Sequence, residues 1–339
     1  MSHLHVLPVE RKTVYEHNDT FVWNGITGIE AADGVILYSW YTGGEREPRP
    51  ENLVVFTRSM DGGETWASPE IACDPPGAVR AADPMLWIGP DGVLRHWLCV
   101  NDSAKDSGDW QVLERTSSDY CGPSVSWTEP TVIEAGLGDW LNMNKPIVLS
   151  DGSWMFPAMV RNGPSKGLSY FEGFKCAGVV ITADAGLTWE GRTTPDFAGS
   201  WIWEPMVIQR DNGDILMYFR TDYGQIFQVH SADQGRTWSE FSATGIPNPN
   251  TRFHLRKLPT GQIILLNNPN AENWGKRTPL ALHISRDDAR TWPEMYIIDT
   301  GEIFMYPDAC LDADGHTLHM SYENRKDIFY ASFDLAQVL

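Results

Sequence analysis

The sequence lacks a long hydrophobic run and has few basic residues. No apolar stretch approaches the roughly 18–20 residues that a membrane-spanning helix needs. Of the 339 residues only 26 are Lys or Arg, against 45 Asp or Glu, which leaves a formal net charge of −19. A surface of this sign repels polyanions. We therefore expect neither nucleic acid nor membrane as a partner.

Cysteine is scarce too, and it forms no motif. The five cysteines are scattered and include no C-x-x-C pair, so neither a disulfide framework nor a zinc site is expected. Residues 1–17 contain His, Pro, Glu and Arg where a signal peptide needs an apolar stretch, which favours a cytoplasmic protein. Phosphate loops, serine-nucleophile elbows and H-E-x-x-H motifs are missing as well. We expect neither a cofactor nor a metal.

Turn and strand signals, by contrast, are abundant. The chain has 15 Trp and 30 Gly, which is typical of many short strands and turns. A turn followed by an apolar strand, usually Asp-Gly, recurs six times at intervals of 48–61 residues. The turn glycines are Gly34, Gly92, Gly152, Gly213, Gly261 and Gly315. Six repeats of about 56 residues fill the chain and leave no room for a second domain.

A second motif lies between these hairpins and has the spacing S/T-x-D-x-G-x-T-W. Its copies are 59–66, 182–189, 231–238 and 285–292, with a degenerate fifth at 117–127. We expect its Asp to cap a turn, its Gly (or Ala289) to take an unusual backbone dihedral, and its Trp to pack under the neighbouring strand. Because nearly every repeat carries the motif, it cannot define one active site, and its role is structural.

Repeats of four strands without helical periodicity predict an all-β fold, a single six-bladed β-propeller over residues 1–339. Residues 13–23 are expected to supply the outer strand that closes the ring with the last blade. Four copies of the motif in register with six hairpins resemble the Asp-box (BNR-repeat) pattern of the sialidase (neuraminidase) superfamily over essentially the whole chain. That superfamily includes sialidases, other acidic-sugar hydrolases, lyases and non-catalytic binders.

The resemblance implies a particular chemistry. A sialic-acid-like sugar carries a carboxylate on its anomeric carbon, which would repel a carboxylate nucleophile, and sialidases use a tyrosine instead. A phenol needs an adjacent base to attack near neutral pH, and a separate acid protonates the leaving oxygen. Arginines hold the carboxylate of the substrate in bidentate geometry.

The family's catalytic groups are matched one residue at a time. Tyr306, in the segment Y-P-D-A, resembles the nucleophile, and Glu204, in W-E-P-M-V, resembles its activating base. Arg220 and Arg277 resemble two carboxylate-binding arginines. Glu47, in a charged proline-rich loop, stands near the place of the family's acid, with a side chain one methylene longer than the usual Asp.

The first repeat departs from the family. A sialidase normally has Arg-Ile-Pro there, whereas residues 21–25 read F-V-W-N-G. Either another arginine reaches the site, or the substrate is not an ordinary sialoside. The candidate arginines are Arg46, Arg49, Arg80 and Arg252.

Other residues are candidates for binding the substrate. Arg252 and His254 begin the fifth repeat, and Lys145 has the matching place in the third. Trp40 and Tyr41 offer a stacking platform for a sugar ring, although packing is the ordinary role of such residues.

We therefore expect an exo-acting retaining glycosidase that releases a terminal acidic sugar, such as sialic acid or a related ketosidic sugar. The expected partner is this acidic sugar or glycan. One alternative is a lyase on a uronic-acid-containing glycan, with Tyr306, Tyr223 or His254 abstracting the proton beside the carboxylate. Another is a non-catalytic glycan- or protein-binding propeller. The oligomeric state does not follow from the sequence.

Overall fold

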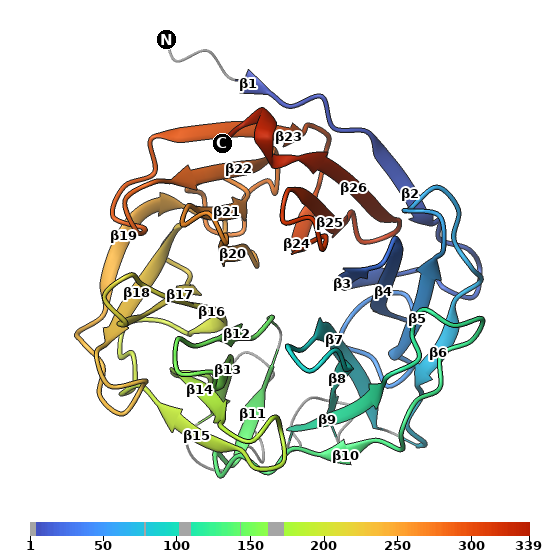
Figure 1. Cartoon of the computed structure of the whole chain (residues 1–339), viewed down its shortest axis with the longest axis horizontal. Helices are drawn as coiled ribbons and strands as arrows, with labels where there is room; N and C mark the ends of the chain where they lie inside the picture. The colour runs from blue at the N-terminus through green and yellow to red at the C-terminus, as the bar shows by residue number, and fades with distance from the viewer. Residues whose placement is uncertain (1–4, 78, 102–109, 143, 162–172) are drawn as a thin grey trace. The chain divides into compact units, whose positions relative to one another are not determined.

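The regular secondary structure of the chain is almost all β-strand in a computed structural model, which describes residues 5–77, 79–101, 110–142, 144–161 and 173–339. Within these ranges the strands form six sheets, and the one helical element is the 3-10 turn η1 (Leu335–Gln337). The six sheets are the blades of a β-propeller, so the predicted fold class is confirmed (Figure 1).

The described residues divide into two compact units. Unit 1 contains those within Met1–Val9, Glu134–Pro164 and Phe171–Tyr306, and unit 2 contains those within Glu10–Ile133 and Pro307–Leu339. Each unit holds three sheets, and one strand crosses the boundary after Tyr306. The single domain expected from the repeats stays a prediction.

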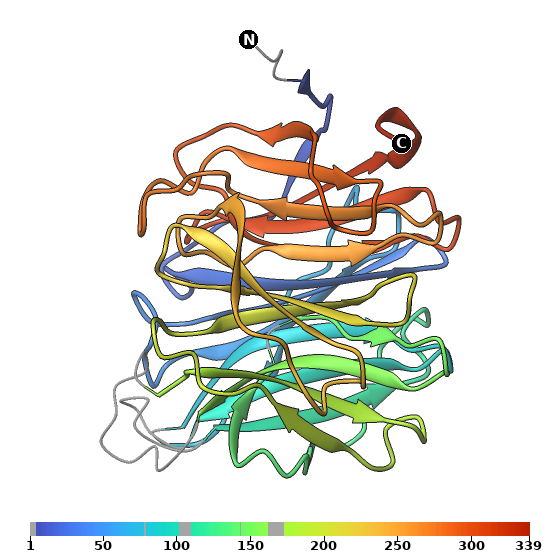
Figure 2. The same ribbon diagram turned by 90° about the vertical axis from the view of Figure 1, so that its left-hand side faces the viewer.

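Unit 1 contains the third, fourth and fifth blades. The third has the strands β11 (Asp139–Leu141), β12 (Ile147–Val148), β13 (Trp154–Arg161), β14 (Cys176–Thr182) and β15 (Glu190–Thr193). The fourth has β16 (Trp203–Gln209), β17 (Ile215–Arg220), β18 (Gln225–Ser231) and β19 (Ser242–Pro247). The fifth has β20 (His254–Lys257), β21 (Ile263–Asn267), β22 (Leu280–Ser285) and β23 (Glu294–Asp299), to which β1 (His5–Val6) adds in parallel. Figure 2 shows these sheets from a second side.

Unit 2 contains the first, second and sixth blades. The first has β3 (Asn24–Ala32), β4 (Val35–Thr42), β5 (Leu53–Ser59) and β6 (Glu70–Cys73). The second has β7 (Arg80–Ile88), β8 (Leu94–Asn101), β9 (Trp110–Ser117) and β10 (Thr131–Val132). The sixth has β24 (Met305–Leu311), β25 (Thr317–Glu323), β26 (Ile328–Asp334) and β2 (Arg11–Tyr15). The N-terminal segment thus supplies the last strand of this sheet, as expected, but the strand is residues 11–15 rather than 13–23.

The repeated turns have the local structure that the sequence predicts. All six hairpin glycines have positive φ, between 71° and 94°, which glycine adopts at little steric cost. In the Asp-box at 231–238, Asp233 accepts hydrogen bonds from the backbone N and the side-chain hydroxyl of Thr237, and Ser231 donates to it. Ala289 takes the glycine place of the fourth box with φ 61°. The structural role expected for this motif is confirmed.

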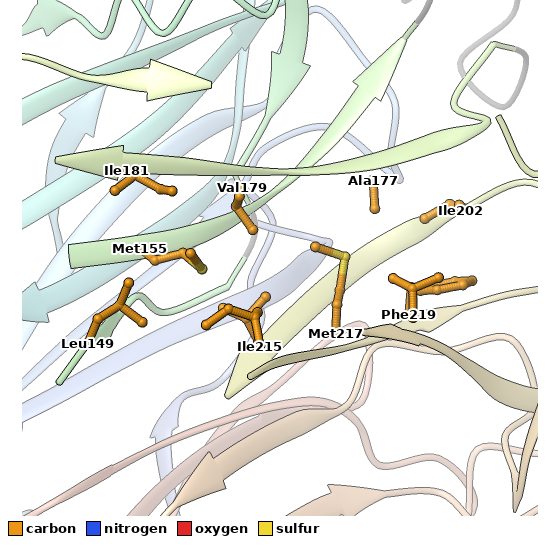
Figure 3. Packing of buried hydrophobic residues seen from close by; sticks show 11 residues of the cluster. Leu149, Met155, Ala177, Val179, Ile181, Ile202, Ile215, Met217 and Phe219 are labelled. Carbon is orange, nitrogen blue, oxygen red and sulfur yellow. The ribbon is translucent and has the colours of Figure 1, made fainter. Parts of the chain in front are cut away.

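A hydrophobic layer joins the third and fourth blades in unit 1 (Figure 3). Alternate residues of β14 and of β17 contribute to one buried cluster, because side chains two apart along a strand share a face. From β14 these are Ala177, Val179 and Ile181, and from β17 they are Ile215, Met217 and Phe219. This packing holds β16 and β17 in place, the strands on which two of the predicted site residues lie.

Candidate functional site

Glu204 lies at a β-bulge. The register between β16 and β17 shifts between Trp203 and Met206, and Glu204 has a left-handed φ of 48° directly before Pro205. Bulges re-aim a side chain and are frequent next to active sites. The carboxylate is almost fully buried, with 3% of the residue exposed.

Tyr306 has the same backbone conformation. It is the second residue of β24, has φ 55° and precedes Pro307. In unit 2, Asp83 repeats the pattern before Pro84, with φ 49° and a register shift between Ala82 and Met85. Three blades therefore use one local structure to present a carboxylate, a phenol and a second carboxylate.

Arg220 connects Glu204 with Tyr306. It ends β17, pairs in register with Trp203, and its guanidinium lies 4.5 Å from the centre of the Trp203 ring. Its Nη1 donates to Oε2 of Glu204 at 2.9 Å. Burial alone would lower the pKa of Arg220, but the charges of Glu204 and Tyr306 and the hydrogen bonds with both side chains raise it. Arg220 therefore stays charged although it is buried.

Arg277 also contacts the phenol. Its guanidinium stands 4.9 Å from the centre of the Tyr306 ring, in the geometry of a cation–π contact. Its Nη1 lies 2.8 Å from Sδ of Met305, and its Nη2 donates to the backbone oxygen of Asn250 at 3.1 Å. Only 5% of Arg277 is exposed, so this side chain does not point into solvent.

The structure thus brings four predicted residues, Tyr306, Glu204, Arg220 and Arg277, into one contiguous set within unit 1. Both guanidinium groups interact with the phenol, and Arg220 also pairs with the one carboxylate, so the set carries a local excess of positive charge. Such an arrangement can bind an anion and can stabilise negative charge that develops on the phenol oxygen.

Three further predicted residues are buried in unit 1. His254 begins β20 and Arg252 lies two residues before it, and Lys145 stands shortly before β12. The residue before Lys145 is Asn144, whose Nδ2 donates to the backbone oxygens of Glu204 and Pro205. The segment that carries Lys145 therefore contacts the bulge of Glu204.

Glu47, the predicted acid, belongs to unit 2. It is half-buried in the loop between β4 and β5. Of the other arginines considered for the site, Arg46 in this loop is exposed and Arg49 is half-buried, whereas Arg80 is buried with its guanidinium 4.9 Å from the ring centre of Trp110.

Asn24 stands in the first-blade segment that lacks arginine, and its side-chain amide makes hydrogen bonds to other residues of the protein. Its Nδ2 donates to the backbone oxygens of Phe21 and Lys326, and its Oδ1 accepts from Nε1 of Trp40 at 2.8 Å. Trp40 is fully buried and Tyr41 is 1% exposed, so both are core residues and neither is a platform for a sugar. The burial of these rings corrects that suggestion.

Sequence reasoning missed two neighbours of the arginines. Trp274 is 52% exposed, and its ring centre lies 5.5 Å from the guanidinium carbon of Arg220 and 6.0 Å from that of Arg277. Asn250 accepts hydrogen bonds from both arginines. Neither residue belongs to a motif, and the one local signal was the turn-forming sequence N-P-N at 248–250.

In the part of the chain that the structure describes, no group of three or more His, Cys, Asp or Glu side chains is arranged to hold a metal ion. No helix among the described residues is long and apolar enough to cross a membrane.

Residues 35–320 match the family described as BNR repeat-like domain. The chain belongs to this family. An anhydrosialidase from Macrobdella decora is similar to it, with 23% identity over 231 residues that cover 64% of this chain and 28% of that protein. The chain therefore spans little more than a quarter of the length of this curated relative.

Solved structures share the fold of this BNR-repeat chain. The NanB sialidase of Streptococcus pneumoniae superimposes with a TM-score of 0.77 at 14% identity, covering 97% of this chain and 71% of that one. A protein of unknown function from Dyadobacter fermentans DSM 18053 gives 0.72 at 18% identity, covering 97% and 100%. With its Asp-boxes and these matches, the chain is a divergent member of the sialidase superfamily.

Proposed function

We propose that this chain is an exo-acting retaining glycosidase that releases a terminal acidic sugar, sialic acid or a related ketosidic sugar. The observation that carries the proposal is the position of Arg220, in contact with Glu204 on one side and Tyr306 on the other. The similar proteins named as an anhydrosialidase and a sialidase make a sialoside the first substrate to test.

In the proposed first step, the hydroxyl oxygen of Tyr306 attacks the anomeric carbon and Glu204 accepts the phenol proton. The bond to the leaving oxygen breaks, and Glu47, assigned as the acid from sequence alone, protonates that oxygen. In the second step Glu47 takes a proton from water, which attacks the same carbon. The bond to Tyr306 then breaks, and Tyr306 recovers its proton from Glu204. Two displacements give net retention.

The cations of unit 1 are proposed to bind the substrate. Arg220 and Arg277 orient its carboxylate, and Arg252, His254 and Lys145 make further contacts with the sugar. The whole chain carries a net charge of −19, which opposes the approach of an anion. Screening limits that repulsion to about 8 Å at physiological ionic strength, so nearby guanidinium groups dominate at short range.

The direct test replaces the nucleophile. Tyr306→Phe should reduce the turnover of an aryl sialoside by about a thousand-fold or more, because the phenol oxygen forms the intermediate. The matched control is Tyr296→Phe, which removes a hydroxyl that hydrogen-bonds to Glu294 on β23. Turnover equal to that of the wild type in Tyr306→Phe, or a first product of inverted configuration by NMR, would contradict the proposal.

The same assay separates the other two functions. A lyase would leave an unsaturated sugar that absorbs in the ultraviolet, whereas a hydrolase leaves a reducing sugar. A binding propeller would form no product, and its Tyr306→Phe variant would retain the affinity of the wild type for the glycan. Either result would mean that the chain is a lyase or a binding protein and not a glycosidase.

A further inference from the structure

Asn250 lies between the two arginines of the candidate site. Its Oδ1 accepts a hydrogen bond from Nε of Arg220 at 2.5 Å. Its backbone oxygen accepts one from Nη2 of Arg277 at 3.1 Å. Asn250 is buried, so no solvent competes for these hydrogen bonds. One residue thus holds both guanidinium groups, one through its side chain and the other through its backbone.

The backbone at Asn250 suits this double role. Its φ is 60°, in the left-handed region that Asn tolerates better than most residues. The turn is fixed on both sides of Pro249, since the backbone N of Asn248 donates to Gly224 and the backbone N of Thr251 donates to Oδ1 of Asn248. A turn anchored in this way gives the oxygens of Asn250 defined positions.

Asn250 also holds the loop that carries Trp274. Its Nδ2 donates to Oδ1 of Asn273 at 3.0 Å, and Trp274 follows directly, with its ring beside both guanidinium groups. Trp274 itself has a left-handed φ of 60°. The amide of Asn250 therefore connects Arg220 with the turn at Asn273.

We propose that Asn250 is a positioning residue, which fixes the separation and orientation of the guanidinium groups of Arg220 and Arg277. The inference rests on the proposed function, in which these arginines bind the carboxylate of an acidic sugar. Bidentate binding of a carboxylate needs both planar forks in defined positions, and a long side chain that is free to rotate loses that alignment.

Two substitutions separate the contacts of Asn250. Asn250→Gly keeps the left-handed backbone and the oxygen that faces Arg277, but it removes both side-chain hydrogen bonds. Asn250→Asp keeps an acceptor for Arg220 and loses the donor to Asn273. The matched control is Asn212→Gly in the β16–β17 hairpin, where the lost amide serves Asp214 and no arginine.

Kinetics with an aryl sialoside provide the first measurement. Asn250→Gly should raise KM about ten-fold or more and lower kcat by a smaller factor, because the arginines then bind the carboxylate of the substrate less tightly in the ground state. Asn250→Asp should restore KM to within about three-fold of the wild type, since the acceptor for Arg220 is present. The methyl ester of the substrate, which has no charge for the arginines, should bind wild type and Asn250→Gly alike. Equal KM values for wild type and Asn250→Gly would overturn the inference.

A crystal structure of Asn250→Gly tests the positioning role of Asn250 without an activity assay. The guanidinium of Arg220 should leave its place or occupy more than one position, while Asn212→Gly should leave it unchanged. If Asn250→Gly does not fold, Asn250→Ser replaces it, because a serine hydroxyl is too short to span the same distance. An unmoved Arg220 would refute positioning by Asn250. A wild-type protein that neither binds nor cleaves acidic sugars would refute the proposed function alone.

Discussion

The Oε2 atom of Glu204 lies 2.9 Å from Nη1 of Arg220, and both side chains are at most 5% exposed. A buried ion pair stabilises a fold weakly, but the loss of one partner leaves an uncompensated charge in a medium of low dielectric constant. The pair therefore matters to the folded state when one partner is lost, besides its place in the candidate site.

Arg220→Met should lower the free energy of unfolding at pH 7 by about 3–5 kcal/mol, because the buried carboxyl group of Glu204 then loses its partner. The double variant Arg220→Met, Glu204→Gln should recover part of this loss, since the unpartnered carboxyl group is gone. Urea unfolding followed by circular dichroism measures both values. A loss in the double variant equal to the sum of the losses in Arg220→Met and Glu204→Gln alone would show that the two side chains are not coupled.

Trp274→Ala should weaken the affinity for an acidic sugar several-fold and change the free energy of unfolding by no more than about 0.5 kcal/mol. The ring stands beside both guanidinium groups but is half exposed, so it contributes more to the site than to the core. Isothermal titration with sialic acid measures the affinity. Leu187→Ala, which removes a side chain from an exposed Asp-box position, is the control and should bind like the wild type.

The Asp-boxes should make the protein sensitive to strong acid. Hydrogen bonds from the motif, above all from its Thr, lower the pKa of each Asp from 3.8 to about 2. The folded state then binds fewer protons than the unfolded state, so this stabilisation is complete above pH 4 and is lost as the pH falls through 2. The residues are Asp61, Asp184, Asp233 and Asp287.

Acid unfolding at constant ionic strength measures this effect. Asp184→Asn should reduce the slope of stability against pH between 4 and 2, whereas Asp19→Asn, outside every Asp-box, should leave it unchanged. Identical slopes for Asp184→Asn and the wild type would contradict the assignment.

His283 should add a second pH dependence, in a milder range. Burial lowers the pKa of this ring from 6.5 to about 4, and its Nε2 lies 2.9 Å from Oδ1 of Asn267. Below pH 6.5 the His283 ring is protonated in the unfolded chain but stays neutral in the folded protein down to about pH 4. About 3 kcal/mol of the stability present at pH 7 is therefore lost by pH 4. His283→Gln should remove this slope. A slope retained in that variant, measured by urea unfolding from pH 7 to 4, would assign the effect to another group.

The blades were predictable because their signals are local and repeated. An Asp-Gly turn or an Asp-box depends on residues within about eight positions, such as Asp233 and Thr237, and the six turns and four Asp-boxes support one another. Such patterns define hairpins without any knowledge of distant contacts. The end of β2 at Tyr15 was harder to predict from the sequence, because the length of this strand depends on its pairing with β26.

The candidate site was predictable only where a motif carried it. Glu204 and Tyr306 have recognisable flanks, whereas Asn250 meets Arg220, 30 residues away, through a backbone conformation that no pattern of side chains reports. Trp40 and Trp274 look alike in sequence, yet one is fully buried and the other half exposed. Tertiary packing decides whether such a tryptophan is buried or exposed, and this packing cannot be predicted from a single sequence.

The left-handed residue before proline at Asp83, Glu204 and Tyr306 has a consequence for how such proteins acquire new chemistry. All three residues leave the regular strand conformation, and at Asp83 and Glu204 the strand register also shifts, so the group displayed there depends less on the pairing that builds the sheet. A single codon change can then exchange acid for phenol or amide while every neighbouring strand keeps its partner. Engineers who want a different reaction from this scaffold should begin at these three positions.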